Sequence, residues 1–587
     1  MRGAISTLCR PGGPPRNRAA MANSSDPGHL LSRDLAERTL VTAMALNPLV
    51  ALDRSQLFAA AGRVAARALA HPKPLRGRAA TLARELGEIV AGKSKREPGA
   101  SDRRFADPAF REHPIYRRLM QGYLAWREAL LGLVEEVDLD TKSRARGQFA
   151  LSLLTEAVAP TNTLAGNPAA LKRAFETGGA SLLRGLRNFA ADVVDNGGLP
   201  AQVDRRGFKV GQTLACTPGQ VVFRSEILEL LQYAPSTPKV YQRPLVLIPP
   251  QINKYYVLDL AKGRSLIEFA VAQGFPVFAV SWRNPTPAQR EWGLDAYVDA
   301  LCDATDAARE ITGSDQVNPV GVCAGGITTS VLLGHLAARG DERVASATFP
   351  VTVLDTSVDS ITFQLASEKT VAAALARSQK EGIMSGREMA RVFSWLRPND
   401  LVWNYWVSNY LLGNQPPAFD ILYWNNDYTN LPATLHAEFL EILLKNSLCQ
   451  PGALEVQGTP IDLGRVRADV YAVGALGDHI TPWEACYRTP GLFGGQRTFV
   501  MSTGGHIQAV VNPVGNAKMG YFVNDNYESN AQLWLKGARE HKGSWWQHWA
   551  AWLATRSGPE RAAPPALGSA LHSPQMAAPG RYVLQEA

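Results

Sequence analysis

The segment GVCAGG at residues 321–326 constrains the fold more than any other feature of the chain. Glycines two residues before and two residues after Cys323 match the Gly-x-Ser-x-Gly turn, with cysteine in place of serine. That turn joins a buried strand to a helix and holds a nucleophile near the positive end of the helix, which favours a thiolate. Apolar residues precede the turn, and residues 327–336 continue as a helical pattern. We therefore predict a nucleophilic Cys323; the alternative is an inert, buried cysteine.

Short apolar runs that predict buried strands alternate with helical patterns from about residue 245 onward. Strand alternating with helix predicts a parallel sheet covered by helices, the α/β class. About a hundred residues rich in Trp, Tyr, Asn and Pro interrupt this alternation and predict an inserted lid. The predicted strands are residues 245–248, 276–282, 318–322, 345–354, 470–473 and 498–501. Helical patterns lie between the first two strands, ending at 273, and at about 294–311 and 327–336.

The remaining segments suggest a catalytic domain flanked by other parts. Apolar residues recur at helical spacing after Tyr116, with no catalytic signature, and predict a mostly helical N-terminal domain. The last thirty residues, with Pro564, Pro565, Pro574 and Pro579, predict a disordered tail. The predicted divisions are a disordered extension at 1–35 (translation could as well begin at Met21), a helical domain at 36–215, a catalytic domain at 216–556 with a lid at about 356–465, and a tail at 557–587.

An acid and a histidine stand where this fold needs them. A nucleophile elbow of this type is followed along the chain by the acid and then by the histidine. Asp478 follows the strand predicted at 470–473, and His506 follows the next one, within a glycine-containing loop. His479 is the rival base, but a histidine adjacent to the acid is poorly placed for that acid to orient it. We predict a Cys323–His506–Asp478 triad on an α/β-hydrolase fold.

The chemistry expected of this triad is acyl transfer. The Ala324 amide and an amide from the loop after the first core strand, for which Ile252 is the candidate, would form the oxyanion hole. Attack of a thiolate on a thioester gives another thioester, so the acyl group stays activated for a hydroxyl nucleophile. A serine ester would suit hydrolysis better.

Composition excludes several other classes. The net charge of +8 includes four arginines in the first twenty residues, and no basic stripe is interleaved with aromatic residues, so nucleic-acid binding is not expected. Six cysteines without paired spacing argue against a disulfide framework and favour the cytoplasm. No apolar run is long enough to span a bilayer, and no residue cluster has metal-ligand spacing.

Longer strings resemble the polyhydroxyalkanoate synthases over nearly the whole chain from Met21 to Tyr582. The strings are PPQINKYY at 249–256, SWRNPT at 281–286, RPNDLVWNYW at 397–406, DILYWNND at 420–427 and GHIQ at 505–508. Others look closer to the medium-chain, pseudomonad-like class II type: DRRF at 102–105, APTNT at 159–163, FETGG at 175–179, AQREWGL at 288–294 and VLDT at 353–356.

The resemblance implies roles for individual residues. Cys323 would be the nucleophile, His506 the base and Asp478 its partner. Ala324, Thr352 and Gly504 stand where the medium-chain type usually has serine. The resemblance places the last two beside the acyl pocket, so they bear on the length of the acyl group accepted. The residues that the resemblance places at the substrate are Thr352, Gly504, Gln508, Arg397 and Trp424.

The resemblance also implies the reaction. An (R)-3-hydroxyacyl group would pass from coenzyme A to Cys323 and then to a 3-hydroxyl, so that a polyester grows without any cofactor besides the coenzyme A of the substrate. The implied partners are the growing polyester, a second copy in a homodimer and the surface of polyester granules in the cytoplasm.

Two other readings of the chain remain open at this stage. A cysteine esterase or acyl-thioesterase on the same fold would release free acid, and a granule scaffold with an inactive fold would do no chemistry. The stripe of Trp545, Trp549 and Trp552 either packs on the catalytic domain or contacts the granule.

Overall fold

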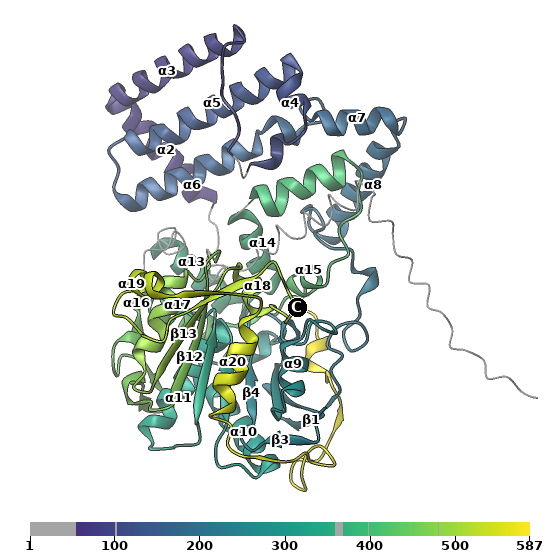
Figure 1. The fold of residues 1–587 in the computed structure, drawn as a ribbon. Coiled ribbons are helices and arrows are strands. Elements are labelled where there is room, and N and C mark those ends of the chain that lie inside the picture. The colour runs from purple at the N-terminus through teal and green to yellow at the C-terminus, as the bar shows by residue number, and fades with distance from the viewer. Residues whose placement is uncertain (1–53, 100–101, 358–367, 397, 479) are drawn as a thin grey trace, which may run out of the picture.

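The computed structural model describes residues 54–99, 102–357, 368–396, 398–478 and 480–587. The predicted extension at 1–35, together with Arg397 and His479, lies outside the described residues. Figure 1 shows a helical part above a part built on one large sheet.

The helical part is formed by amphipathic helices that bury small apolar clusters. One cluster surrounds Phe105, Phe110 and Met120. Asn167 begins one of the helices by accepting a hydrogen bond from the Ala170 amide, as expected of Asn before Pro. The helices are α2 (Arg54–Ala70), α3 (Pro72–Val90), α4 (Ala109–Glu112), α5 (Pro114–Glu136), α6 (Thr141–Ala157), α7 (Pro168–Glu176) and α8 (Ala180–Asp195).

The sheet has eleven strands in the order β15-β14-β13-β12-β7-β6-β4-β5-β2-β1-β17. The six strands from β13 to β5 pair in parallel, and antiparallel strands flank them on both sides. The parallel strands are β4 (Leu245–Ile248), β5 (Val277–Trp282), β6 (Asn318–Gly321), β7 (Ser346–Pro350), β12 (Asp469–Ala475) and β13 (Arg497–Ser502). The flanking strands are β1 (Gly219–Arg224), β2 (Leu228–Tyr233), β14 (Gly520–Val523), β15 (Arg539–Lys542) and β17 (Met576–Ala577).

Helices cover the sheet because its central strands are apolar on both faces. Phe269 and Trp546 pack together, so α9 and α20 share one face, which is turned toward the viewer in Figure 1. Helix α11, which follows the elbow, is buried along nearly its whole length and contacts α10. These helices are α9 (Leu266–Ala272), α10 (Leu294–Thr312), α11 (Ala324–Ala338), α17 (Trp483–Arg488), α18 (His506–Val510), α19 (Ala531–Gly537) and α20 (Trp545–Ala554).

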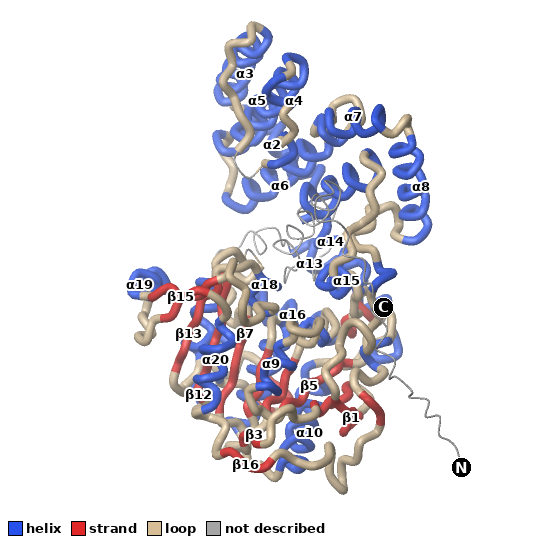
Figure 2. Tube along the Cα trace, turned by 45° about the vertical axis from the view of Figure 1, so that its right-hand side comes forward, coloured by secondary structure: helices blue, strands red, loops and turns tan. Residues whose placement is uncertain are grey.

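An insertion separates β7 from β12 in the chain, although these strands are neighbours in the sheet. It contacts the helical part: the Asn188 side chain in α8 donates to the Asn409 and Asn414 carbonyls at 2.9 Å each. The insertion contains the helices α13 (Glu368–Glu381), α14 (Gly386–Leu396), α15 (Asp420–Asn425) and α16 (Ala433–Lys445), with π-helical turns at Asn399–Trp403 and Trp406–Leu411 and the short strands β8 (Ile383–Met384), β9 (Leu431–Pro432), β10 (Glu455–Val456) and β11 (Thr459–Pro460). Figure 2 shows α13, α14 and α15 between the sheet and the helical part.

The predicted disordered tail at 557–587 is wrong. Strand β16 (Glu560–Ala562) pairs with β3 (Lys239–Tyr241), and β17 pairs with β1. Tyr582 and Val583 are buried. A proline-rich segment without apolar periodicity is ordered here because it pairs with strands that the catalytic domain already provides.

The tryptophan stripe packs on the catalytic domain. Trp545 and Trp549 are buried in α20, and the Trp549 indole donates to the Thr348 hydroxyl of β7 at 3.1 Å. The Trp549 side chain is fully enclosed by the protein and presents no surface to a granule.

Candidate active site

Cys323 lies in the tight turn between β6 and α11 that the sequence predicts. Its backbone has φ 53° and ψ −121°, an unfavourable conformation for a residue with a side chain. The Cys323 amide donates to the Pro350 carbonyl at 3.1 Å, which ties the turn to the neighbouring strand β7. A strained residue held by surrounding contacts is typical of a functional site.

The glycines of the turn are required by close packing. A Cβ atom on Gly321 would lie 2.5 Å from the Thr329 hydroxyl, and one on Gly325 would lie 2.4 Å from the Ile248 carbonyl oxygen. The second contact is with backbone, which cannot move aside easily. The turn can therefore approach β4 only with glycine at 325.

Asp478 and His506 meet beside the elbow, as the order of the triad predicts. Asp478 follows β12, and His506 is the first residue of α18, which follows β13. The His506 Nδ1 lies 2.7 Å from the Asp478 Oδ2, and the Cys323 side chain lies close enough to the imidazole to raise its pKa. All three side chains are buried. The structure thus brings together all three predicted residues.

Thr481 is a site residue that the sequence analysis missed. Its hydroxyl donates to the Asp478 Oδ2 at 2.6 Å and also lies 3.1 Å from the His506 Nδ1. The amides of Ile480 and Thr481 donate to the Asp478 Oδ1 at 2.8 and 3.0 Å. The available signal was the spacing, because an aspartate commonly accepts hydrogen bonds from residues two and three places later.

These contacts set the charges of the pair. Burial by itself would lower the pKa of His506, but the Asp478 carboxylate and the Cys323 side chain together raise it above its ordinary value. Burial would raise the pKa of Asp478, but His506 and the Thr481 donors hold it below its ordinary value. Asp478 is therefore a carboxylate that keeps His506 strongly basic, as a proton acceptor for a thiol or hydroxyl requires.

The two expected oxyanion donors lie on segments that pack on each other. Ala324 is the first residue of α11, where amides have no partner within the helix. Ile252 belongs to residues 249–254, here called the oxyanion loop, in which the Gln251 side chain donates to the Thr328 hydroxyl of α11 at 2.8 Å. The role of Ile252 as an oxyanion donor remains a prediction.

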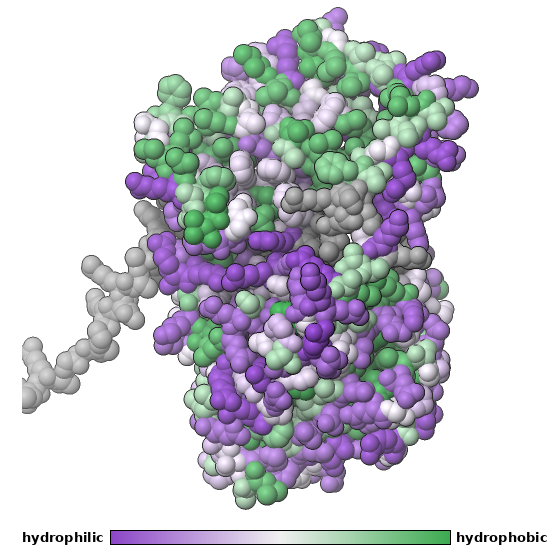
Figure 3. Space-filling model, turned by 180° about the vertical axis from the view of Figure 1, so that it is seen from behind, coloured by the Kyte–Doolittle hydropathy of each residue, from purple (hydrophilic) through white to green (hydrophobic). Residues whose placement is uncertain are grey.

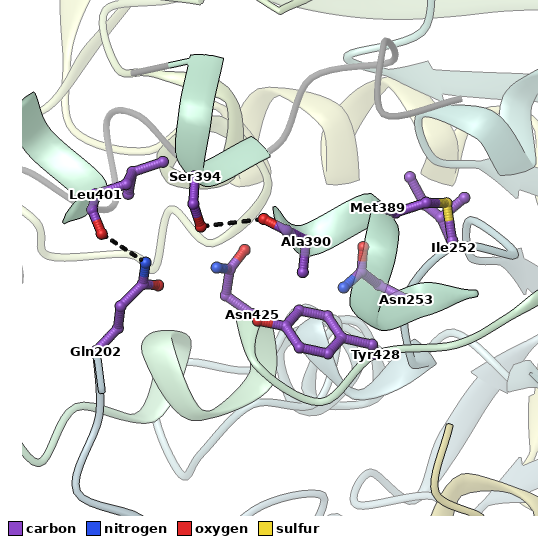
Figure 4. A pocket seen from close by; sticks show the side chains of 10 residues that line it. Gln202, Ile252, Asn253, Met389, Ala390, Ser394, Leu401, Asn425 and Tyr428 are labelled. Carbon is purple, nitrogen blue, oxygen red and sulfur yellow. Dashed lines mark hydrogen bonds between the residues drawn. The ribbon is translucent and has the colours of Figure 1, made fainter. Parts of the chain in front are cut away.

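A pocket opens next to Ile252. Figure 4 shows Ile252, Asn253, Met389 and Tyr428 around it, so the oxyanion loop, α14 and the segment after α15 all contribute. Gln202 closes another side by donating to the Leu401 carbonyl at 3.0 Å. The insertion therefore forms a wall of a pocket next to the oxyanion loop.

Thr352 lies behind the elbow. Its hydroxyl is within 3.4 Å of the Gly321, Cys323 and Pro350 carbonyl oxygens, and the residue is buried. A Cβ atom on Gly326 would collide with the Thr352 side chain. Thr352 thus contacts the reacting residue through the backbone of the turn.

The other residues expected at the substrate lie in different surroundings. Gly504 lies just before α18, the helix that contains His506 and Gln508, and the Gln508 side chain accepts from the Gly505 amide at 3.1 Å. Trp424 is buried, and its indole donates to the Lys254 carbonyl at 2.7 Å, so it braces the oxyanion loop.

The described residues contain no group of three or more His, Cys, Asp or Glu side chains that could hold a metal ion. None of their helices is both long and apolar enough to cross a membrane.

Comparison with known proteins identifies both parts of the chain. Residues 101–270 match the family model for the N-terminus of poly-beta-hydroxybutyrate polymerase, and residues 244–513 match the alpha/beta hydrolase fold. A yeast (Saccharomyces cerevisiae) monoglyceride lipase structure aligns with 60% of this chain and 99% of its own at 8% identity, with a TM-score of 0.34, a likeness too low to bear on function.

Several relatives cover most of the chain, and two of them illustrate the relation. Poly(3-hydroxyalkanoate) polymerase 1 of Ectopseudomonas oleovorans is 48% identical, over 94% of this chain and 98% of its own. The PhaC subunit of poly(3-hydroxyalkanoate) polymerase from Cupriavidus necator is 43% identical, over 85% of this chain and 86% of its own. The higher identity to the first agrees with the predicted pseudomonad-like type. These relations show that the chain belongs to the poly(3-hydroxyalkanoate) polymerases, the acyltransferases that make polyester from hydroxyacyl-CoA.

Proposed function

We propose that polymerisation proceeds through a covalent acyl-Cys323 thioester. The observation that supports this most directly is the chain of contacts from Cys323 to His506 to Asp478 at the turn between β6 and α11. It gives the thiol a base, and gives the base a carboxylate that orients it.

In the first step, the Cys323 thiolate attacks the thioester carbonyl of an (R)-3-hydroxyacyl-CoA. The tetrahedral oxyanion accepts hydrogen bonds from the Ala324 and Ile252 amides, and the carbon–sulfur bond to coenzyme A then breaks. The leaving thiolate takes the proton that His506 removed from Cys323. The acyl group stays activated because one thioester replaces another.

In the second step, His506 takes the proton of a 3-hydroxyl group, whose oxygen attacks the acyl-Cys323 carbonyl. An ester forms, the Cys323 thiolate leaves, and the chain is longer by one unit. Water would compete with that hydroxyl, so the insertion over the oxyanion loop would act as a lid that excludes it.

Mass spectrometry after brief mixing with 3-hydroxyacyl-CoA tests this proposal. We expect an acyl adduct on the peptide that carries Cys323, and loss of both adduct and polymer in Cys323→Ala. Cys323→Ser should form little polymer, because a serine needs stronger activation and gives a less reactive ester. Polymer from Cys323→Ala at the wild-type yield would refute the proposal. Free acid without polymer from the wild type would instead favour a thioesterase.

We further propose that the helical part contacts the polyester granule. Large apolar side chains are exposed along its helices, and on α8 they include Leu183, Leu186 and Val194. Figure 3 shows green apolar atoms over much of the helical part, whereas the catalytic part below is mostly purple. A contiguous apolar surface commonly marks an interaction site, and the product of this enzyme is itself apolar.

Binding to purified polyester particles tests the granule contact. Leu183→Gln together with Leu186→Gln should lower the bound fraction. Leu571→Gln, at an exposed leucine of the catalytic part, should leave it unchanged and serves as the matched control. Equal binding by all variants would contradict the proposal. Homodimer formation remains a prediction, which light scattering over a range of concentrations measures.

A further inference from the structure

Lys254 is a buried lysine at the end of the oxyanion loop that the reaction above does not use. Its side chain is 5% exposed. The ammonium lies 2.8 Å from the Asp427 Oδ1 in the insertion and donates to the Gln585 backbone carbonyl at 2.7 Å. One charge thus joins three segments that are far apart in the sequence.

The insertion holds the same loop at several points. The Trp424 indole donates to the Lys254 carbonyl, and the backbones of Asn253 and Tyr428 form an isolated antiparallel bridge. The Tyr256 hydroxyl donates to the Asp427 Oδ2 at 2.8 Å, so the carboxylate that pairs with Lys254 is itself held in place.

The C-terminal end of the chain reaches the same place. Figures 1 and 2 both show it beside α15. The Gln585 side chain accepts from the Asn284 amide at 3.0 Å, and the Glu586 carbonyl accepts from the Asn284 side chain at 2.7 Å. The Gln585 carbonyl is therefore fixed when Lys254 donates to it.

We propose that Lys254 is a positioning residue that holds the Ile252 amide, the proposed oxyanion donor, in its working position. It lies two residues after Ile252, and a donor works only when it is held within about 0.5 Å of the productive geometry. A buried ammonium loses much of its hydration and stays paired. Lys254 therefore holds the oxyanion loop against Asp427 and the Gln585 carbonyl, and both contacts are needed to keep the Ile252 amide in place. This inference rests on the proposed acyl transfer through Cys323.

Comparing two reactions of the same thiol separates positioning from general damage. Acylation by 3-hydroxyacyl-CoA forms an oxyanion, whereas alkylation of Cys323 by iodoacetamide forms none. We expect Lys254→Met to slow single-turnover release of coenzyme A about 10- to 100-fold, less than the ~10²–10³-fold caused by losing an oxyanion donor outright. The alkylation rate should change by less than about twofold, because it does not depend on an oxyanion.

Three further variants sharpen the test. Lys254→Arg keeps the charge and the donors and should recover part of the acylation rate. A chain ending at residue 584 lacks the Gln585 carbonyl and should likewise lose acylation but not alkylation. Adding Lys254→Met to this chain should have little further effect, because both changes remove the same contact between Lys254 and Gln585. Lys262→Met, at an exposed lysine of the same domain, should leave both rates unchanged.

The outcomes are distinct. Acylation and alkylation falling in parallel, or acylation unaffected in both Lys254→Met and the shortened chain, would overturn the positioning role. Acylation that persists in Cys323→Ala would instead overturn the proposed function on which it rests.

Discussion

The hydroxyl of Thr481 offers a sharp test of how the acid of the triad works. The Asp478 carboxylate accepts four hydrogen bonds, two from the Ile480 and Thr481 amides and one each from the Thr481 hydroxyl and His506. Thr481→Val removes one of them with almost no change of shape. The other three remain and should keep Asp478 in place.

The size of the effect follows from the type of bond. A hydrogen bond to a charged group contributes about 1.5–3 kcal/mol, and about 1.4 kcal/mol is tenfold in rate. If all of this free energy were lost from the transition state, kcat/KM would fall by about 10- to 150-fold. We expect roughly tenfold, because the remaining donors compensate in part.

The pH profile distinguishes this account from a general loss of stability. The Thr481 donors help to hold the pKa of Asp478 below its ordinary value, so the stability and activity that depend on the carboxylate are lost only as pH falls through that low pKa. Without the hydroxyl the pKa rises, and the acid limb of kcat/KM should move to higher pH.

Coenzyme A release measured from about pH 2.5 to 8, so that the range extends below the ordinary pKa of an aspartate, in wild type, Thr481→Val and Thr481→Ser checks this. Thr481→Ser keeps a hydroxyl and should retain the wild-type limb. An unshifted limb with kcat/KM within about twofold of wild type in Thr481→Val would refute the reasoning, since a charged hydrogen bond is worth more than that.

Other predictions concern the turn, the base and the acyl group. Gly325→Ala should abolish acylation because its Cβ meets the backbone at 2.4 Å, whereas Gly87→Ala, with nothing within 4 Å, should leave acylation intact in the coenzyme A assay. The pKa of His506 is raised to about 10, so the stability that its protonation contributes is complete below pH 6.5 and is lost as the pH rises through about 10. Thermal scans should therefore show that the melting temperature of His506→Gln falls less steeply over that range than that of the wild type. Thr352→Ser and Gly504→Ser should each change the ratio of kcat/KM values for 3-hydroxybutyryl and 3-hydroxydecanoyl thioesters by more than about twofold, and a smaller change would remove that residue from the determinants of acyl length.

The central sheet and the triad could be predicted because their signals are local. The six parallel strands were each predicted from a short apolar run, with differences at the ends. The strand expected at 345–354 stops at Pro350, because Val351 has φ 46° and turns the chain away. The elbow was evident from its glycines, and the acid and histidine from their places after β12 and β13.

The elements that were missed depend on distant partners. Strands β16 and β17 have two or three residues and no apolar periodicity, and they exist because β3 and β1 offer unpaired edges. Thr481 gains its role only when β12 and β13 lie side by side. The contacts of Lys254 likewise require three segments that no local pattern connects.

The pairing of β1 with β17 also has a consequence for synthesis of the chain. Gln220 pairs with Ala577, more than 350 residues later. At about 5–20 residues per second, the edge of β1 stays open on the ribosome for roughly 20–70 s after it emerges. An exposed strand edge is a template for pairing with other chains. The yield of active enzyme should therefore depend on translation rate, temperature and chaperone supply more steeply than the stability of the finished fold would suggest.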